Sequence, residues 1–387
     1  MSKKLSISKK SAMMNLMIFF LISHAVVVFD AFFIIDLAMS MMRYAVFLVV
    51  MALYLKRPSI TRFDFLWCIF LFYLITTTIL GDGILVSVIG PAIDITLLMM
   101  LFHVYPDDGR QILKSTTIAL SFYAYVNLLL LFLYPNGLWI DPISGKGYYL
   151  LGGNYNGMGA RFVMALVTNL MICKDSTKAK LNFVCLLAVS LFSVLFVHSM
   201  TSTVSILLLL GLWIAARMRK RKLLMISFFA LYMFIQSFVV FMLTDLSDTP
   251  YVANFIENTL HKNLTFTHRT VLWENSNRMI SESPWLGYGY HDKVWNAEHM
   301  DGPGSHNFVY TILLYGGFPL LAIFITLVIA ALRHSSDYLN DKRFCQLILG
   351  ITTLFFMMIF EYYTFFIIAY LVCLIYYYPQ LVPKEDE

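Results

Sequence analysis

The sequence predicts an all-α polytopic membrane protein of about 12 transmembrane helices with one large extracytoplasmic loop. Two observations predict this fold class. Of the 387 residues, 59% are hydrophobic and 13% are charged, whereas soluble domains are about 25% charged. The apolar residues also stand in continuous runs rather than at alternate positions, which argues against a transmembrane β-barrel. Spans of about 20 residues would use most of the chain and leave little room for a soluble domain.

Twelve apolar segments can be placed as membrane-spanning helices. The chain then divides into residues 1–243 with helices one to nine, residues 244–305 as the large outer loop, and residues 306–387 with helices ten to twelve and a cytoplasmic tail. The twelve segments are at about 12–35, 38–55, 64–80, 84–104, 115–135, 156–173, 181–198, 203–217, 223–243, 306–332, 344–359 and 362–378.

The basic residues predict how these helices are oriented. If the N-terminus is inside and each segment crosses once, 21 of the 28 Lys and Arg residues fall on the inner side. Because loops rich in Lys and Arg stay on the cytoplasmic side, both termini are expected in the cytoplasm. The net charge of +5 is therefore a topology signal, and we expect no nucleic acid partner. Seven cations remain for the outer side: Arg43, Lys146, Arg161, Lys262, Arg269, Arg278 and Lys293.

The outer segment 244–305 is much longer than an ordinary connection. Loops of this length are usually either functional or disordered. This one contains three tryptophans and is not low in complexity, so we expect it to be folded. Within it, residues 269–283 have one helical face and end before Pro284, which predicts a short helix.

Two arginines of the outer set are candidates for binding an anion. Arg269 opens the predicted loop helix, and a guanidinium held near the membrane surface suits a diphosphate because its fork of donors meets phosphate oxygens bidentately. The alternative is an arginine in contact with solvent or lipid headgroups. Arg161 lies a few residues inside the sixth segment, where an ionisable group is costly and favours a functional role. Its alternative is a side chain that extends to the outer interface.

His306 is the candidate general base. It follows the flexible segment 302–305 at the start of the tenth apolar segment, and an imidazole there can take a proton from an incoming hydroxyl. A structural histidine is the alternative. We predict no metal and no cofactor, because the nearby polar side chains match no metal-ligand spacing. Those side chains are His291, Asp292, Glu298, His299 and Asp301.

Two acids lie at membrane level. Asp94 falls within the fourth segment, and Glu361 falls in the last outer turn. Ionisable groups at this depth are expensive and are usually paired or functional. Asp94 is expected to pair with a buried arginine, to relay protons, or to make a structural polar contact.

The outer loop and the segments beside it carry several motifs in order. Together they resemble the O-antigen ligase and Wzy-type polysaccharide polymerase superfamily, in which an asparagine-containing stretch also precedes a helix in many members. The motifs read Gly153-Asn154-Tyr155-Asn156-Gly157, His268-Arg269-Thr270-x-x-Trp273, Met279-Ile280, Ser283-Pro284, Leu286-Gly287-Tyr288-Gly289, and Ser305-His306-Asn307 before an apolar run with Gly316-Gly317.

This resemblance implies a membrane-embedded glycosyltransferase with a GT-C-like fold, acting at the outer face of the bacterial plasma membrane. Its donor would be a glycan on undecaprenyl diphosphate, and its surroundings would be membrane lipids. Arg269 would bind the diphosphate and stabilise the leaving group, while His306 would act as the base on the acceptor hydroxyl. Roles in loop and glycan positioning are implied for Trp273, Gly287, Gly289, Tyr290, Asn307 and Asn154.

The sequence departs from this family at one place. Many members open a helix after the sixth or seventh span with a Ser-Arg-Gly-type motif, and the corresponding stretch here reads Met200-Thr201-Ser202-Thr203. A second diphosphate-binding arginine would therefore have to be Arg161 or Arg278.

Three functions are compatible with these observations. The first is a polymerase that joins lipid-linked repeat units into an O-antigen, capsule or exopolysaccharide, for which the resemblance makes a chain-length regulator and a flippase plausible partners. The second is a ligase that transfers a finished glycan to another acceptor. The third is a lipid-linked oligosaccharide flippase or other transporter, which would need charges along the middle of its spans and two matched halves. The ionisable groups gather instead at the outer face, which favours chemistry there.

Overall fold

The computed structural model describes most of the chain. The described residues are 2–27, 32–56, 58–140, 145, 147–173, 176–216, 221–246, 269–361 and 365–382. The first part of the predicted outer loop, with Lys262 and His268, lies outside them, as does Lys146.

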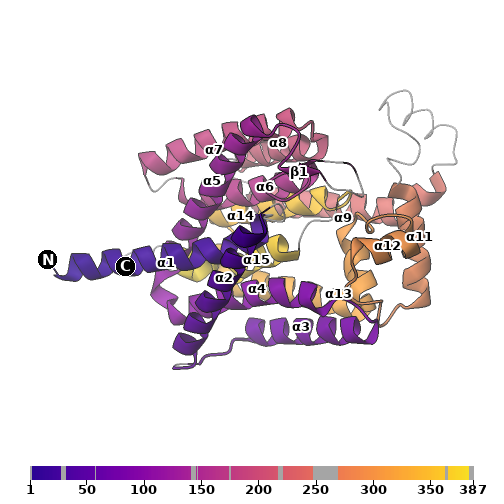
Figure 1. The fold of residues 1–387 in the computed structure, drawn as a ribbon, viewed down its shortest axis with the longest axis horizontal. Coiled ribbons are helices and arrows are strands. Elements are labelled where there is room, and N and C mark those ends of the chain that lie inside the picture. The colour runs from indigo at the N-terminus through magenta and orange to yellow at the C-terminus, as the bar shows by residue number, and fades with distance from the viewer. Residues whose placement is uncertain are drawn as a thin grey trace.

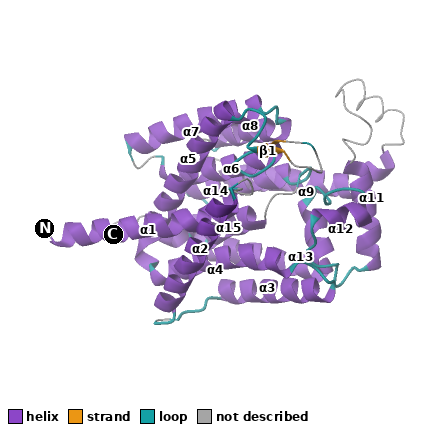
Figure 2. Ribbon diagram, viewed as in Figure 1, coloured by secondary structure: helices purple, strands orange, loops and turns teal. Residues whose placement is uncertain are grey.

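Twelve helices in the described part correspond in order to the twelve apolar segments. They form one bundle, shown in Figures 1 and 2. Their bounds are α1 Ser2–Val26, α2 Phe33–Tyr54, α3 Arg62–Leu80, α4 Leu85–Val104, α5 Gly109–Leu133, α6 Tyr155–Ile172, α7 Thr177–Phe196, α8 Met200–Ala215, α9 Arg221–Leu246, α13 Phe308–His334, α14 Lys342–Met357 and α15 Phe365–Tyr376.

Shorter elements connect and cover these helices. The predicted loop helix is present as α11, and it ends before the proline as expected. The short elements are the antiparallel pair β1 Trp139–Ile140 and β2 Gly147–Tyr148, the helices α11 Arg269–Glu282, α12 Lys293–Met300 and α16 Tyr378–Leu381, and the 3₁₀ turns η1 Pro106–Asp108 and η3 Ser336–Tyr338.

The composition of these helices confirms a mostly helical, multi-pass membrane protein. Within the described residues, seven helices are long and apolar enough to cross a membrane. Two further apolar helices, α8 and α15, are shorter. A helix that crosses a membrane of the usual thickness needs about 20 residues, so length alone does not show whether α8 and α15 cross it.

One predicted boundary is wrong. The first segment, placed at 12–35, runs across a break, because α1 ends at Val26 and α2 begins at Phe33. The apolar run continues through this region and gives no stop signal in the sequence. In the structure, Val27 leaves the helix and forms an antiparallel bridge with Leu151 of the α5–α6 connection. A tertiary contact therefore ends the helix where the local sequence would let it continue.

The two ends of the bundle differ. Helices α11 and α12 lie together at one end, and α1 extends from the opposite end (Figure 1). At that opposite end, Lys10 of α1 pairs with Asp108 beside the start of α5. Arg110 of α5 donates to the carbonyl oxygen of Leu381 at 2.9 Å. Helices α1 and α16 therefore both contact the region where η1 joins α5, at the end remote from α11 and α12.

Asp94 is paired with a buried arginine, one of its expected roles. Arg43 on α2 contacts the Asp94 carboxylate on α4 at 3.4 Å, and both side chains are almost completely buried. A buried carboxylate or guanidinium needs such a partner because leaving water costs each ion several kcal/mol. The pair therefore links α2 to α4 within the bundle.

A break in α13 joins the outer loop to the bundle. The helix has non-helical backbone angles at Gly316 and Gly317. The carbonyl groups of Leu314 and Tyr315, just before the break, accept hydrogen bonds from the N–H groups of Tyr288 at 2.6 Å and Gly289 at 3.2 Å. The break therefore supplies acceptors that a continuous helix would have used internally.

We define residues 284–290 as the strap. At its far end, the Tyr290 carbonyl accepts a hydrogen bond from Ile84 at 2.7 Å, in the α3–α4 turn. A Cβ at Gly289 would lie 2.5 Å from the Thr78 Cα, and one at Gly287 would lie 2.5 Å from the Leu314 carbonyl oxygen. The Gly-Tyr-Gly motif thus lets the loop backbone lie directly on α3 and α13.

We expect Gly317→Ala to destabilise the protein by about 1–3 kcal/mol. Gly317 has a φ of +63°, and an added Cβ would lie 2.3 Å from the Pro284 carbonyl oxygen. The measurement is the temperature at which half of the detergent-solubilised protein is no longer monodisperse. Gly211→Ala on α8 is the matched control, because its Cβ would meet no atom within 4 Å. Equal midpoints for the two variants would contradict this account of the strap.

Candidate active site

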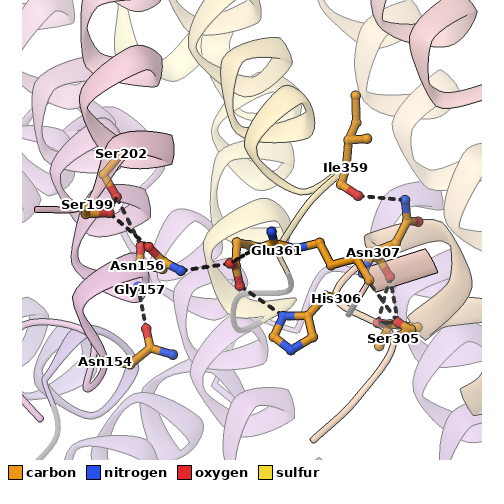
Figure 3. A network of polar contacts seen from close by, with 12 residues as sticks. Asn154, Asn156, Gly157, Ser199, Ser202, Ser305, His306, Asn307, Ile359 and Glu361 are labelled. Carbon is orange, nitrogen blue, oxygen red and sulfur yellow. Dashed lines mark hydrogen bonds and ion pairs between the residues drawn. The ribbon is translucent and has the colours of Figure 1, made fainter. Parts of the chain in front are cut away.

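Glu361 lies at the centre of a polar network at the outer-loop end of the bundle (Figure 3). It sits in the turn between α14 and α15, and its side chain is almost fully buried. Asn156 of α6 donates to one carboxylate oxygen at 2.7 Å, and His306 contacts the other through Nδ1 at 3.0 Å. Arg269, the first residue of α11, forms an ion pair with the same carboxylate. Three distant segments therefore meet on one acid.

Glu361 remains ionised in this setting. Burial raises the pKa of a carboxyl group, but the hydrogen bond and charge of His306 and the charge of Arg269 outweigh it and hold the Glu361 pKa below its ordinary value. The ionised form accepts hydrogen bonds at both oxygens, as the geometry requires. The network therefore contains a fixed negative charge between two basic side chains.

His306 is held in a conformation unusual for its residue type. Its φ is +51°, in the left-handed region that non-glycine residues seldom adopt. Because an ionised carboxylate can only accept, Nδ1 donates to Glu361, and the imidazole has its lone pair on Nε2 whenever it is in the neutral form. About 29% of the side chain is exposed, so a substrate can approach it. This orientation is the one that a general base needs.

Asn307 fixes the position of its neighbour. It is fully buried and caps α13, its Oδ1 accepting from the N–H groups of Val309 and Tyr310. Its amide donates to the Ile359 carbonyl oxygen at 3.0 Å and exchanges hydrogen bonds with Gln236 of α9. Asn307 therefore ties the start of α13 to the turn that carries Glu361.

The stretch that lacks the expected arginine still contributes to the network. Ser199, the N-cap residue of α8, donates to the Asn156 side-chain oxygen at 3.0 Å, and Ser202 donates to the Asn156 carbonyl oxygen at 3.3 Å. A Cβ at Gly159 would lie 2.1 Å from the Ser202 hydroxyl oxygen, so α6 and α8 are in close contact here. Hydroxyl groups at this helix start thus orient the amide that contacts Glu361.

Arg161 is buried on α6 and turns back toward the start of that helix. Its Nη1 donates to the Gly157 carbonyl oxygen at 3.0 Å. Asn154 caps the same helix, accepting from the Gly157 N–H at 2.6 Å. The guanidinium therefore lies inside the protein near the Asn156 side of the network and does not extend into solvent.

The other predicted residues occupy supporting positions. Trp273 is fully buried one turn after Arg269 and lies near Phe360, 6.2 Å between ring centroids. Arg278 is exposed on α11 and pairs with Glu282 at 3.4 Å, so the structure does not bring it into the Glu361 network. Gly287, Gly289 and Tyr290 belong to the strap described above.

Three of the residues considered as possible metal ligands make other contacts. The rings of His291 and His299 both stack with the ring of Trp295, at centroid distances of 3.8 and 4.1 Å. Asp292 caps α12 by accepting from the Trp295 N–H. Within the described ranges, no group of three His, Cys, Asp or Glu side chains is arranged to hold a metal ion.

Sequence reasoning missed three members of the network. Glu361 was identified as a membrane-level acid without a role, and Asn156 and Ser199 were not assigned. An acid in an outer turn was the available signal, because such a group requires a cationic partner. Nothing in the sequence indicated which of the outer cations would meet it.

These features define a class: a multi-pass membrane protein with an Arg–Glu–His network beside the short helices α11 and α12 at one end of its bundle. Residues 185–325 match the family model Wzy_C, described as O-antigen ligase. The match supports the O-antigen ligase and Wzy superfamily, which confirms the resemblance drawn from the motifs. Comparisons with curated proteins and with solved structures gave no match.

The low pKa of Glu361 predicts a pH dependence of stability. Because the folded pKa is below the ordinary 4.5, the ionised carboxylate stabilises the fold above that pH, and this contribution is lost as the pH falls through the folded value. Thermal midpoints measured from pH 6 down to pH 3 should therefore fall less steeply for Glu361→Gln than for the wild type. The exposed Glu274→Gln on α11 should behave as the wild type, and an unchanged slope in Glu361→Gln would contradict the prediction.

Proposed function

We propose that this protein is a glycosyltransferase that moves a glycan from a polyprenyl diphosphate to a sugar hydroxyl at the outer face of the plasma membrane. One observation carries the proposal: Arg269 and His306 meet on the buried Glu361 at the end of a helical membrane bundle. A cation beside an oriented imidazole suits a reaction with an anionic leaving group and a hydroxyl nucleophile. The family match supports enzymes of this type.

Arg269 would bind the diphosphate. A guanidinium has five N–H donors in one plane, so it can contact a carboxylate on one edge and phosphate oxygens on another. About 20% of the Arg269 side chain is exposed, which allows a headgroup to reach it. As the bond between the anomeric carbon and phosphate breaks, its electron pair goes to a phosphate oxygen, and the cation stabilises that charge. Arg161 is a second candidate on the α6 side.

His306 would be the base, and Glu361 a positioning residue. The acceptor hydroxyl would transfer its proton to Nε2 of His306 as its oxygen bonds to the anomeric carbon. Glu361 keeps the proton on Nδ1 and stabilises the imidazolium that forms. The diphosphate leaving group supplies the driving force, so neither nucleotide nor metal takes part in this scheme.

We infer that the reaction is polymerisation of repeat units carried on undecaprenyl diphosphate, for a capsule, exopolysaccharide or O-antigen. A ligase reaction is the second candidate, because the matching family model is described as O-antigen ligase. The two differ in the acceptor: a polymerase uses a second lipid-linked repeat unit, and a ligase uses a different molecule. A chain-length regulator and a flippase would be partners of the polymerase.

The proposal includes a topology and a fold. All twelve helices that match the apolar segments would cross the membrane, in a GT-C-like arrangement, with both termini in the cytoplasm. Two observations support it: Lys10 of α1 and Leu381 of α16 both contact the region where η1 joins α5, at one end of the bundle, and α11 and α12 lie at the other end. The site would then face outward.

We expect Arg269→Ala to lower the rate of glycan transfer by about 10²–10³-fold, because one well-placed charge donor contributes about that much. The assay uses purified protein and a synthetic undecaprenyl-diphosphate repeat unit, with products resolved on a gel. Arg333→Ala, an exposed arginine at the other end of α13, is the matched control. A product ladder identifies a polymerase, and product only on addition of a separate acceptor identifies a ligase. Wild-type rates in Arg269→Ala would refute its role.

His306→Ala should lower the maximal rate by about 10²–10⁴-fold, the usual contribution of a general base. Glu361→Gln should lower the same rate with little change in KM, because it acts through the imidazole. His334→Ala, an exposed histidine that stacks on Tyr376, is the control. The readouts are the pH–rate profile and the separate kcat and KM values. A Glu361→Gln variant that changes KM alone would show that Glu361 binds substrate and does not position the base.

A further inference from the structure

An apolar cavity lies beneath the strap, between α3, α4, α13 and the start of α15. Its volume is about 110 Å³, and it is open on one side. Its walls are mainly aromatic and aliphatic, with representative lining residues Trp67, Phe70, Leu74, Val88, Ile312 and Phe365.

The cavity begins one helical turn from the candidate active site. Thr311 lines it and donates from Oγ1 to the Asn307 carbonyl oxygen at 2.8 Å, beside His306. Phe365 lines it too, four residues after Glu361 in sequence. Because one helical turn advances about 5.4 Å, the apolar space is next to the polar network along α13. The strap residue Tyr290 also lines it.

The lining suits hydrocarbon better than water. A buried water needs two to four polar partners, and the polar groups here are sparse hydroxyls such as those of Ser87 and Thr311. The indole N–H of Trp67 already donates to the Thr96 hydroxyl oxygen at 3.2 Å, which leaves the ring as an apolar surface. Because an empty apolar cavity destabilises a fold in proportion to its volume, a hydrocarbon occupant would restore the lost contacts.

We propose that this cavity binds the first isoprene units of the polyprenyl chain whose diphosphate is held at Arg269. The identity of the chain rests on the proposed function. A lipid anchored by its headgroup at the polar network presents its first carbons at the depth where the cavity begins. The diphosphate carries more negative charge and more acceptor oxygens than the single phosphate of a bulk phospholipid, so a headgroup contact at Arg269 favours the donor lipid over the surrounding membrane.

The test is photo-crosslinking with a polyprenyl diphosphate that carries a diazirine on one of its first isoprene units and no glycan. The full-length protein in phosphatidylglycerol vesicles is labelled, digested and analysed by mass spectrometry. We expect label on peptides that contain residues 87–92 or 311–315. Unlabelled polyprenyl diphosphate should remove it, and added phosphatidylglycerol should not. Label elsewhere, or equal competition by the phospholipid, would overturn the proposal.

Two variants fill the cavity from α4. Ala92→Phe places a ring inside it, and Ser87→Phe does so nearer its outer end. Each should lower labelling about tenfold, since excluding about two methylene contacts changes affinity by that much. Val86→Phe on the exposed face of the same helix is the matched control and should label as the wild type. Wild-type labelling in both cavity variants would overturn the proposal.

This experiment separates the two proposals. The probe carries no glycan, so labelling does not depend on transfer. Labelling of the cavity without any product in the gel assay would contradict the proposed glycosyl transfer and retain the lipid site. Product formation with no label in the cavity would retain the transfer and overturn the lipid site.

Discussion

The structure depends on the cations and hydrogen-bond donors that surround one buried carboxylate, that of Glu361. An ionised acid taken out of water costs several kcal/mol unless cations and hydrogen-bond donors replace the lost hydration. Glu361 obtains them from Asn156, Arg269 and His306, which come from segments far apart in the chain. This requirement fixes the relative positions of α6, α11 and the start of α13. The same contacts hold an imidazole and a guanidinium on one carboxylate, so the group that organises this part of the fold also organises the candidate site.

The network is kept in place by packing that has no chemical role of its own. Asn307 caps α13 and bonds to the turn before Glu361, while the strap occupies acceptors freed by the Gly316–Gly317 break. Such a scaffold holds side chains more precisely than a loop alone would. It explains why glycines and an asparagine stand beside the histidine and arginine in the motifs. They permit close backbone contact and satisfy buried polar groups, and they hold the His306 and Arg269 side chains in position.

Hydropathy predicted the order and approximate position of the helices because membrane spans depend on local composition. The motifs indicated His306 and Arg269, and in the structure both side chains contact Glu361. Contacts between distant segments could not be predicted this way. The break after Val26 depends on a bridge to Leu151, and the role of Glu361 depends on which cations reach it. The helix start that lacks the arginine nevertheless contacts α6, because Ser199 and Ser202 both donate to Asn156.

The distribution of charge along the bundle helps to decide between an enzyme and a transporter. Arg43 and Asp94 lie within the bundle, but they are buried and paired with each other between α2 and α4. A pair closed in this way stabilises helix contact and offers no path for a polar substrate. The partly exposed groups, Arg269 and His306, lie instead at the end beneath the outer loop, with an apolar cavity one turn further along α13. Charged groups at the end of the bundle, followed by an apolar cavity further along α13, match the shape of a lipid with an anionic headgroup. This arrangement favours a site that receives its substrate from the membrane and acts on the headgroup without carrying it across.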